Sequence, residues 1–226
     1  SNGTVSGATL TQGRDGISNT AYLFDGVNDY ISIPDDSKFD FSAIDELSVS
    51  MWVNIQTYGS DPILYKGSTS SNREFYMGED LRFRTFATDC STTAATTAVK
   101  NETNKWIHVA YTLDADDKQV VYINGVFWDD ETRTGGIGNC NSPIYVGAYG
   151  GTTLNGNVIV DDLKIWDREL SAAEVSSLFN NEISYPSGYV FCNNVITEIS
   201  DVTSTTGRVW MDRNLGASRV ATSSTD

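Results

Sequence analysis

The sequence predicts an all-β protein whose strands form a two-sheet antiparallel sandwich. Short runs of alternating apolar residues, separated by turn residues, recur between residues 21 and 166. Asn124-Gly125 joins two of these runs, and this pair accepts the positive φ angles of the tight turn in an antiparallel hairpin. With 226 residues, 39% of them apolar, the chain can build one substantial core.

The same alternation places the individual strands. They are expected near residues 21–25, 29–33, 47–54, 62–66, 73–77, 80–86, 106–113, 119–124, 143–148 and 157–166. Ser171 and Glu174 then form a capping-box sequence, and Val175, Leu178 and Phe179 follow at helical spacing. We therefore expect one short helix of about ten residues, covering the open end of the sandwich.

The composition restricts the classes of function. Asp and Glu total 30 against 15 Lys and Arg, which gives a net charge of −15. This charge repels phosphates, so no nucleic-acid partner is expected. No apolar run approaches the roughly 18 residues of a membrane span, so no membrane insertion is expected. The N-terminus has no signal-peptide pattern, and a composition rich in Ser, Thr, Asn and Gly favours a mature, extracellular or cell-surface protein.

Two of the three cysteines, Cys90 and Cys140, lie in polar, loop-like stretches that can meet at one end of a sandwich. A disulfide between them would close a loop of about 50 residues and contribute roughly 3 to 4 kcal/mol. Two separate thiols, the normal state in a reducing compartment, are the alternative. Cys192 either stays free or pairs with protein outside this sequence.

Two distant segments carry acids at strand positions, which suggests a metal site. In the second, at least one of Asp161 and Asp162 must face the core, and the cations nearby in sequence are Lys164 and Arg168. A buried carboxylate is costly unless it is paired or bound to a metal. The first segment offers oxygens around Gly26, as hard ions such as calcium prefer. We predict one structural Ca²⁺ held by Asp25, Asn28, Asp29, Asp161 and Asp162.

Several motifs match one known family in order and spacing. They are Phe24-Asp25-Gly26 with Asp29-Tyr30, Ser50-Met51-Trp52-Val53, Trp106-Ile107-His108-Val109-Ala110, Tyr122-Ile123-Asn124-Gly125 and Asp161-Asp162-Leu163-Lys164-Ile165-Trp166. Across about residues 15 to 182 they resemble the laminin G-like, concanavalin A-like jelly roll. The resemblance implies a jelly-roll sandwich, often with one structural calcium near the Phe-Asp-Gly turn and the late Asp pair. It commonly implies a carbohydrate-binding or adhesive role.

The last part of the chain has a different character. From about residue 185 it resembles the start of a Fibrobacter major paralogous domain, chiefly through residues 207–217. We therefore expect a jelly-roll domain over residues 1–183 and a partial segment over 184–226. The segment holds too many large apolar residues to remain solvated, so we expect it to be ordered and to pair by strand addition with a surface that it does not build itself.

The sequence offers no recognisable catalytic arrangement, so the protein is not expected to be an enzyme. Adjacent acids such as Asp161 and Asp162 point to opposite faces of a sheet and do not flank one bond as acid and nucleophile. His108 has no triad or zinc partner at recognisable spacing, and we expect it to be packed in a strand. Aromatic residues in loops are better candidates, because sugar rings stack on aromatic faces. The candidates are Tyr58, Trp128, Tyr145 and Tyr149.

Two functions from different classes remain open. The favoured one is a secreted, non-catalytic module that binds a glycan or another cell-surface ligand, with structural calcium. The other is a structural subunit of an extracellular fibre, adhesin or phage appendage that self-associates through residues 185–226.

Overall fold

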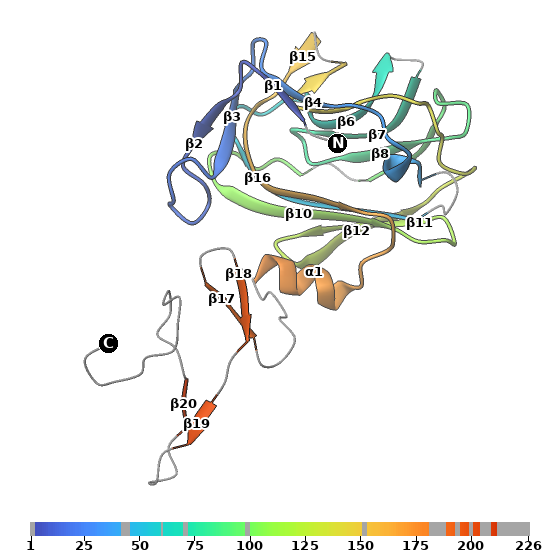
Figure 1. Cartoon of the computed structure of the whole chain (residues 1–226). Coiled ribbons are helices and arrows are strands. Elements are labelled where there is room, and N and C mark those ends of the chain that lie inside the picture. Colours follow the sequence, from blue (N-terminus) through green and yellow to red (C-terminus); the bar gives the residue numbers. More distant parts are fainter. Residues whose placement is uncertain are drawn as a thin grey trace. The chain divides into compact units, whose positions relative to one another are not determined.

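The computed structural model describes residues 3–41, 46–59, 61–69, 72–97, 100–150 and 153–180, together with the strand segments 189–192, 195–198, 201–203 and 209–211. Contacts between residues divide the chain into two units, Ser1–Asn180 and Asn181–Asp226. The first unit is a sandwich of two seven-stranded antiparallel sheets, stacked as two layers (Figure 1). The predicted fold class is confirmed.

We call the two layers sheet A and sheet B. Sheet A has the strand order β1 (Thr4–Ser6), β4 (Tyr30–Ile33), β13 (Ile144–Val146), β6 (Pro62–Thr69), β7 (Asn72–Gly78), β8 (Phe83–Phe86) and β9 (Thr93–Thr96). Sheet B has the order β12 (Val126–Thr132), β11 (Lys118–Ile123), β10 (Trp106–Leu113), β5 (Leu47–Ile55), β16 (Asn157–Trp166), β3 (Ala21–Asp25) and β2 (Thr9–Thr11). The unit also contains the hairpin of β14 (Ala148–Tyr149) and β15 (Thr153–Asn155), the short 3₁₀ helix η1 (Ser37–Phe39) and helix α1 (Ala172–Phe179).

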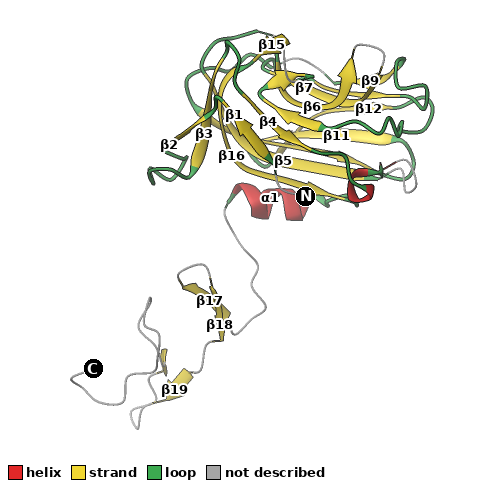
Figure 2. Ribbon diagram, turned by 45° about the horizontal axis from the view of Figure 1, so that its top comes forward, coloured by secondary structure: helices red, strands yellow, loops and turns green. Residues whose placement is uncertain are grey.

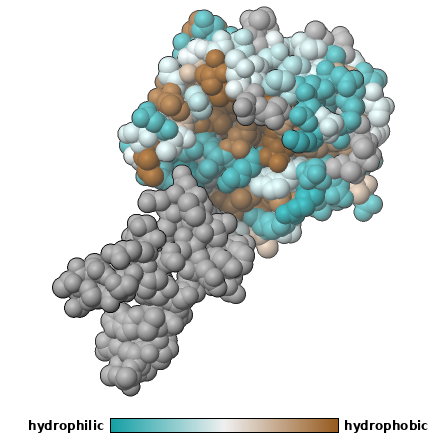
Figure 3. Space-filling view, viewed as in Figure 1, coloured by the Kyte–Doolittle hydropathy of each residue, from teal (hydrophilic) through white to brown (hydrophobic). Residues whose placement is uncertain are grey.

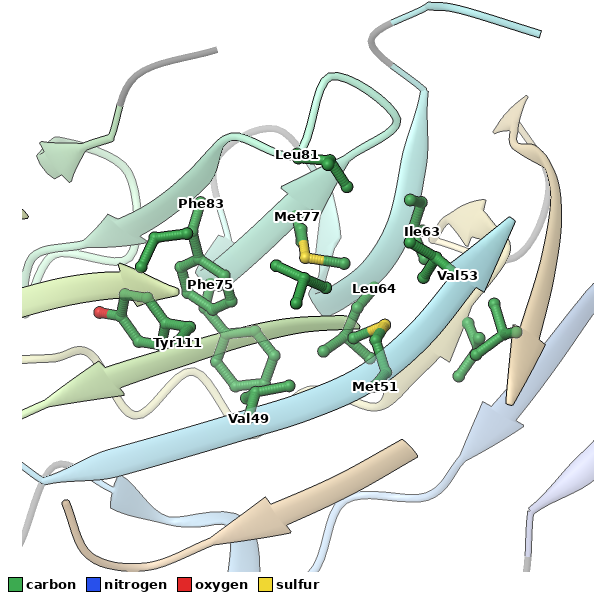
Figure 4. Close-up of a cluster of buried hydrophobic side chains, with 14 of the residues drawn as sticks. Val49, Met51, Val53, Ile63, Leu64, Phe75, Met77, Leu81, Phe83 and Tyr111 are labelled. Carbon is green, nitrogen blue, oxygen red and sulfur yellow. The ribbon is translucent and has the colours of Figure 1, made fainter. Parts of the chain in front are cut away.

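The core lies between the two sheets, where alternate residues of facing strands meet. Val49, Met51 and Val53 of β5 point toward sheet A, and Phe75 and Met77 are among the residues that face them (Figure 4). All five are at most 2% exposed. Each such side chain contributes roughly 1.5 to 3 kcal/mol on burial, so this period-two pattern fixes which face of each strand points inward.

Local chemistry explains the turns and the helix. Asn124 and Gly125 have φ angles of 51° and 73°, as the predicted hairpin turn requires. Helix α1 (Ala172–Phe179) begins at the predicted capping box, in which Ser171 Oγ accepts from the backbone N–H of Glu174 and the Glu174 carboxylate accepts from the N–H of Ser171. Its position differs from the prediction. It lies on the outer face of sheet B, not over an open end, because Val175 packs against Ala110 and Tyr122 there (Figure 2).

The second unit is described only as backbone strands. β17 (Tyr189–Cys192) pairs with β18 (Val195–Glu198), and β19 (Asp201–Thr203) pairs with β20 (Val209–Met211). The Fibrobacter resemblance, the pairing of Cys192 and self-association through residues 185–226 fall on side chains outside the described residues, and they stay predictions. In the described part of the chain, no helix has the length and apolar character needed to cross a membrane.

Candidate functional site

The outer face of sheet A carries a row of aromatic side chains that ends at an arginine. In the strand register, Tyr145 of β13 lies opposite Tyr65 of β6, Tyr65 opposite Tyr76 of β7, and Tyr76 opposite Arg84 of β8. Residues opposite each other in paired strands point to the same face of the sheet. We call Tyr145, Tyr65 and Tyr76 the tyrosine row.

Two further tyrosines extend the row toward solvent. Tyr149 of β14 stacks on Tyr65, with ring centroids 4.4 Å apart, and Tyr30 of β4 packs edge-on against Tyr145 at 6.1 Å. Tyr65 is fully buried, whereas Tyr30, Tyr145 and Tyr149 are half-buried and keep part of each ring accessible. The face therefore presents aromatic surface that rests on a packed aromatic layer.

A glycine places Tyr149 over this layer. Gly147 has a φ angle of +83°, and a Cβ atom there would lie 2.2 Å from the Phe24 ring. Only a residue without a side chain adopts this conformation so close to the core. The resulting bend separates β13 from β14, where the sequence predicts one strand over residues 143–148, and it turns Tyr149 back toward Tyr65.

Arginines gather beside the tyrosine row. The guanidinium of Arg84 lies 5.4 Å from the centroid of the Tyr76 ring, and that of Arg73 lies 4.1 Å from the centroid of Phe86. Arg82 forms an ion pair with Asp80 at 2.8 Å. Burial, and then the charge of Arg82, lower the pKa of Arg84.

A buried ionic cluster and a disulfide fix the loop beside this face. Lys66 Nζ lies 2.9 Å from the Glu74 carboxylate and 3.0 Å from that of Asp35, and the N–H of Cys140 donates to the same Glu74 oxygen at 2.9 Å. Cys140 is bonded to Cys90, with Cα atoms 6.0 Å apart. The predicted disulfide is confirmed, and it ties residue 140 to the turn before β9.

The structure separates the aromatic residues that the sequence analysis groups together. Tyr145 and Tyr149 lie together on the outer face of sheet A. Trp128 is 40% exposed on β12, at the edge of sheet B, where Lys100 Nζ lies 4.1 Å from its ring centroid. Tyr58 is 47% exposed in the loop between β5 and β6. Of the four predicted residues, only Tyr145 and Tyr149 therefore lie on one surface, that of the tyrosine row.

The five predicted calcium ligands do not form one site. Asn157 pairs with Asp25, so Asp161 lies four residues further along β16, about 13 Å away at the usual rise of a strand. Asp25 accepts from the N–H of Val27 at 2.8 Å, and Asp29 accepts from the N–H of Asp25 at 3.1 Å. Among the described residues, no group of three or more His, Cys, Asp or Glu is arranged to hold a metal. The expected link between Asp25 and Asp161 through one ion does not fit this geometry.

The acids of β16 have a protein partner instead. A bulge begins at Asp161, and Asp162 takes a φ angle of 51°. Asp161 accepts from the N–H of Arg14 at 3.2 Å, and the Arg14 guanidinium lies 3.3 Å from the Asp162 carboxylate. Arg14 also lies 4.6 Å from the centroid of Trp52. Arg14 lies 147 positions from Asp161 along the chain, so local sequence patterns do not predict this pairing.

A cavity also lies beside these acids, but it is too small for a glycan. It measures about 130 Å³ and is lined by residues of β3, β4, β13 and β16, including Phe24, Ile31 and Val146. Figure 3 shows apolar surface gathered between the two layers on this side of the sandwich, with hydrophilic residues around it. Ligand pockets usually measure about 300 to 1,000 Å³, so the open face of sheet A is the better candidate.

His108 is a packed strand histidine, as predicted. It is 1% exposed, its Nε2 lies 2.8 Å from Ser50 Oγ, and its ring lies 5.3 Å from that of Trp52. Burial is the main cause that lowers the pKa of His108 to about 4. The ring is therefore neutral at pH 7 and serves the packing between sheet B and α1.

The fold and the ordered motifs together define a concanavalin A-like sandwich. The family model described as the Concanavalin A-like lectin/glucanases superfamily matches residues 25–176, and the chain belongs to this family. No curated protein matches the sequence.

Three solved structures show the same fold at low sequence identity. The binding domain of Paraclostridial Mosquitocidal Protein 1 has 18% identity and a TM-score of 0.62, over 94% of this chain and 59% of that one. The binding domain of Botulinum Neurotoxin DC in complex with SialylT has 17% identity and a TM-score of 0.59, over 84% and 48%. A Trypanosoma rangeli sialidase, bound to a difluoro sugar acid, has 18% identity and a TM-score of 0.54, over 80% and 29%. This chain thus spans less than two thirds of each of these proteins.

Proposed function

We propose that this protein is a secreted, non-catalytic carbohydrate-binding module whose binding surface is the outer face of sheet A. The observation that carries the proposal is that Tyr145 and Tyr149, from two short strands, both pack on the buried rings of Tyr65 and Tyr76 and stay partly accessible. Sugar rings place their C–H faces on such rings, and the phenol hydroxyls accept and donate hydrogen bonds at the ring edges.

The buried phenols of Tyr65 and Tyr76 are uncharged, which suits a binding surface that transfers no proton. Burial is the largest cause that raises the pKa values of Tyr65 and Tyr76 above their ordinary range. Both rings therefore stay protonated at any physiological pH, and the layer under Tyr149 acts as a rigid support. A pre-formed surface of this kind lowers the entropic cost of binding.

The relatives support this proposal at the level of the fold. Two of the solved structures that share the fold have a carbohydrate ligand or a sugar acid in their titles, and others are toxin binding domains. Because the matched part covers less than half of each sugar-bound chain, the place of those ligands does not transfer to this protein. The tyrosine row and Tyr149 are the features specific to this chain.

A glycan array with the full chain tests the proposal. Tyr149→Ala should reduce glycan retention at least tenfold, while Phe127→Ala, a matched aromatic truncation on β12 of sheet B, should leave it unchanged. Retention that depends on Trp128→Ala and not on Tyr149→Ala would move the site to the edge of sheet B. An array without any signal would refute the proposed function.

Structural calcium stays a prediction, now without the link from Asp25 to Asp161. Asp25, Asn28 and Asp29 still share one turn, so thermal unfolding with and without a chelator is the direct measurement. A melting temperature that falls on chelation, and recovers on adding calcium, would support an ion at this turn. An unchanged melting temperature would remove calcium from the description of this protein.

A further inference from the structure

Arg84 forms no ion pair with a carboxylate among the described residues, although Asp80, the partner of Arg82, lies close enough for its charge to act on Arg84. Its guanidinium contacts the Tyr76 ring, and no hydrogen bond or ion pair joins it to a described side chain. The neighbouring cations are occupied: Arg82 pairs with Asp80 at 2.8 Å, and Arg73 donates to the carbonyl of Ser91 at 2.9 Å. The half-buried charge of Arg84 is therefore left for a ligand.

This position is unusual for so acidic a chain. Acids outnumber bases by 30 to 15, so most cations can find a carboxylate nearby. Here burial first, and then the charges of Arg82 and Arg73, lower the pKa of Arg84, and the nearby charge of Asp80, which is paired with Arg82, offsets them only in part. Repulsion between like charges weakens when an anion binds between or beside them.

The geometry relates this charge to the aromatic surface. Arg84 occupies the same register row as Tyr76, Tyr65 and Tyr145, three strand spacings from the last of these, or about 14 Å. Thr96 of β9, opposite Arg84, continues the row with a half-buried hydroxyl. A ligand lying across the strands would meet aromatic rings at one end and a guanidinium at the other.

We propose that the glycan of this face is acidic, with its sugar rings on Tyr145 and Tyr149 and the carboxylate of a terminal sugar on Arg84. The inference rests on the proposed function and adds the chemical class of the ligand. The planar guanidinium can donate two parallel hydrogen bonds to a carboxylate, a geometry that a lysine ammonium does not offer. Neutral glycans would leave the charge of Arg84 unpaired beneath the bound ligand.

The test compares matched glycans on the full chain. An array should hold each oligosaccharide with its terminal carboxylated sugar, without it, and with a sulfate in its place. The variants are Arg84→Gln, Arg84→Lys and Lys118→Gln, the last a control that removes one exposed cation from sheet B. Thermal unfolding of each variant shows whether the fold is retained.

We expect the unmodified chain to bind carboxylated glycans at least tenfold more tightly than their neutral counterparts. Arg84→Gln should reduce this ratio of affinities to about one. Arg84→Lys should keep only part of the preference, and Lys118→Gln should keep all of it. Equal binding of neutral and acidic glycans, unaffected by Arg84→Gln, would overturn the acidic ligand and leave the proposed function standing. Sulfated glycans that bind as well as carboxylated ones would overturn the choice of a carboxylate. Absence of all glycan binding would overturn both proposals.

Discussion

The outer faces of the two sheets carry similar aromatic residues but are covered to different extents. On sheet B, Trp52 and His108 lie beneath Phe179 of α1, with 5.6 Å between the ring centroids of Trp52 and Phe179. On sheet A, Tyr145 and Tyr149 remain half-buried and have no helix over them in the described chain. Strand alternation produces both aromatic faces, and helix α1, later in the chain, covers only the face of sheet B.

Under the proposed function, the face of sheet B serves stability and the face of sheet A serves recognition. The face covered by α1 is an extension of the core, where aromatic contacts contribute to folding. The face of sheet A keeps aromatic and cationic groups accessible, so part of its apolar surface stays in contact with water. Substitutions on sheet B should therefore change stability alone, and substitutions on sheet A should change binding more than stability.

The largest expected effect concerns the disulfide beside the face of sheet A. Replacing Cys90 and Cys140 together by Ser should lower the free energy of unfolding by about 4 kcal/mol, because the bridge closes a loop of 50 residues. Glycan binding should also weaken, because the loop of Cys140, beside the tyrosine row, is no longer tied to the turn before β9. Chemical denaturation measures the first effect.

Cys192→Ser is the matched control for this double substitution, and it should leave stability unchanged. A double variant as stable as the unmodified chain would show that the buried Lys66–Glu74 pair holds the loop without the bridge.

The next effect is the pH dependence of stability, to which one titrating group in or beside each sheet contributes. Burial raises the pKa of Glu79, in the turn between β7 and β8, to about 7. Its contribution to stability is present below pH 4.5, the ordinary value, and is lost as the pH rises to about 7. His108 behaves in the opposite sense, because its pKa falls to about 4, so stability is lost as the pH falls from 6.5 to about 4.

Glu79→Gln should therefore stabilise the protein at pH 8 by up to about 3 kcal/mol, and much less at pH 4.5. The amide introduced by this substitution keeps an oxygen that can accept from the N–H of Asn157, as the Glu79 carboxylate does at 2.6 Å. Chemical denaturation across this pH range measures the free energy of unfolding of the unmodified chain, Glu79→Gln and His108→Gln. The differences separate the pH dependence due to Glu79 from that due to His108. Parallel curves for the unmodified chain and Glu79→Gln would mean that Glu79 is ionised in the folded protein.

A smaller loss of stability is expected at the cover of sheet B. Phe179→Ala removes the stack on Trp52 and should cost about 2 kcal/mol, below the roughly 3 to 5 kcal/mol of a fully buried Phe, because Phe179 is half-buried. Glycan binding should not change. A tenfold loss of binding with Phe179→Ala would contradict the division of roles between the two faces.

The sequence predicted most of the fold because local patterns decide it. Alternation placed the long strands β5, β10 and β16 within a residue of their observed ends, and the capping box placed the start of α1. Short strands such as β1 and β9 were missed, because three or four residues hold too little alternation to detect. The position of α1 was also wrong, since the outer face of sheet B is defined by pairing between distant strands.

The candidate site was harder to predict for the same reason. Tyr145 and Tyr149 were found as loop aromatics, but Tyr65, Tyr76 and Arg84 join them only through the register of β13, β6, β7 and β8. The pairing of the β16 acids depends on a distant contact too. Asp161 needed a partner, and the structure gives it the backbone of Arg14, which sequence proximity does not reveal.

The smallest effect on stability is expected where the effect on binding should be large. Tyr149→Ala leaves Tyr65 packed in its layer and removes one stacked ring, which is worth about 1 kcal/mol. Tyr149→Phe keeps the ring and loses the hydroxyl, so it should retain most of the stacking with both Tyr65 and a sugar. If glycan retention falls equally in both variants, the hydroxyl rather than the ring face binds the sugar. If only Tyr149→Ala loses retention while its unfolding free energy stays within about 1 kcal/mol, the accessible aromatic face of sheet A is a recognition surface, in contrast to the covered face of sheet B.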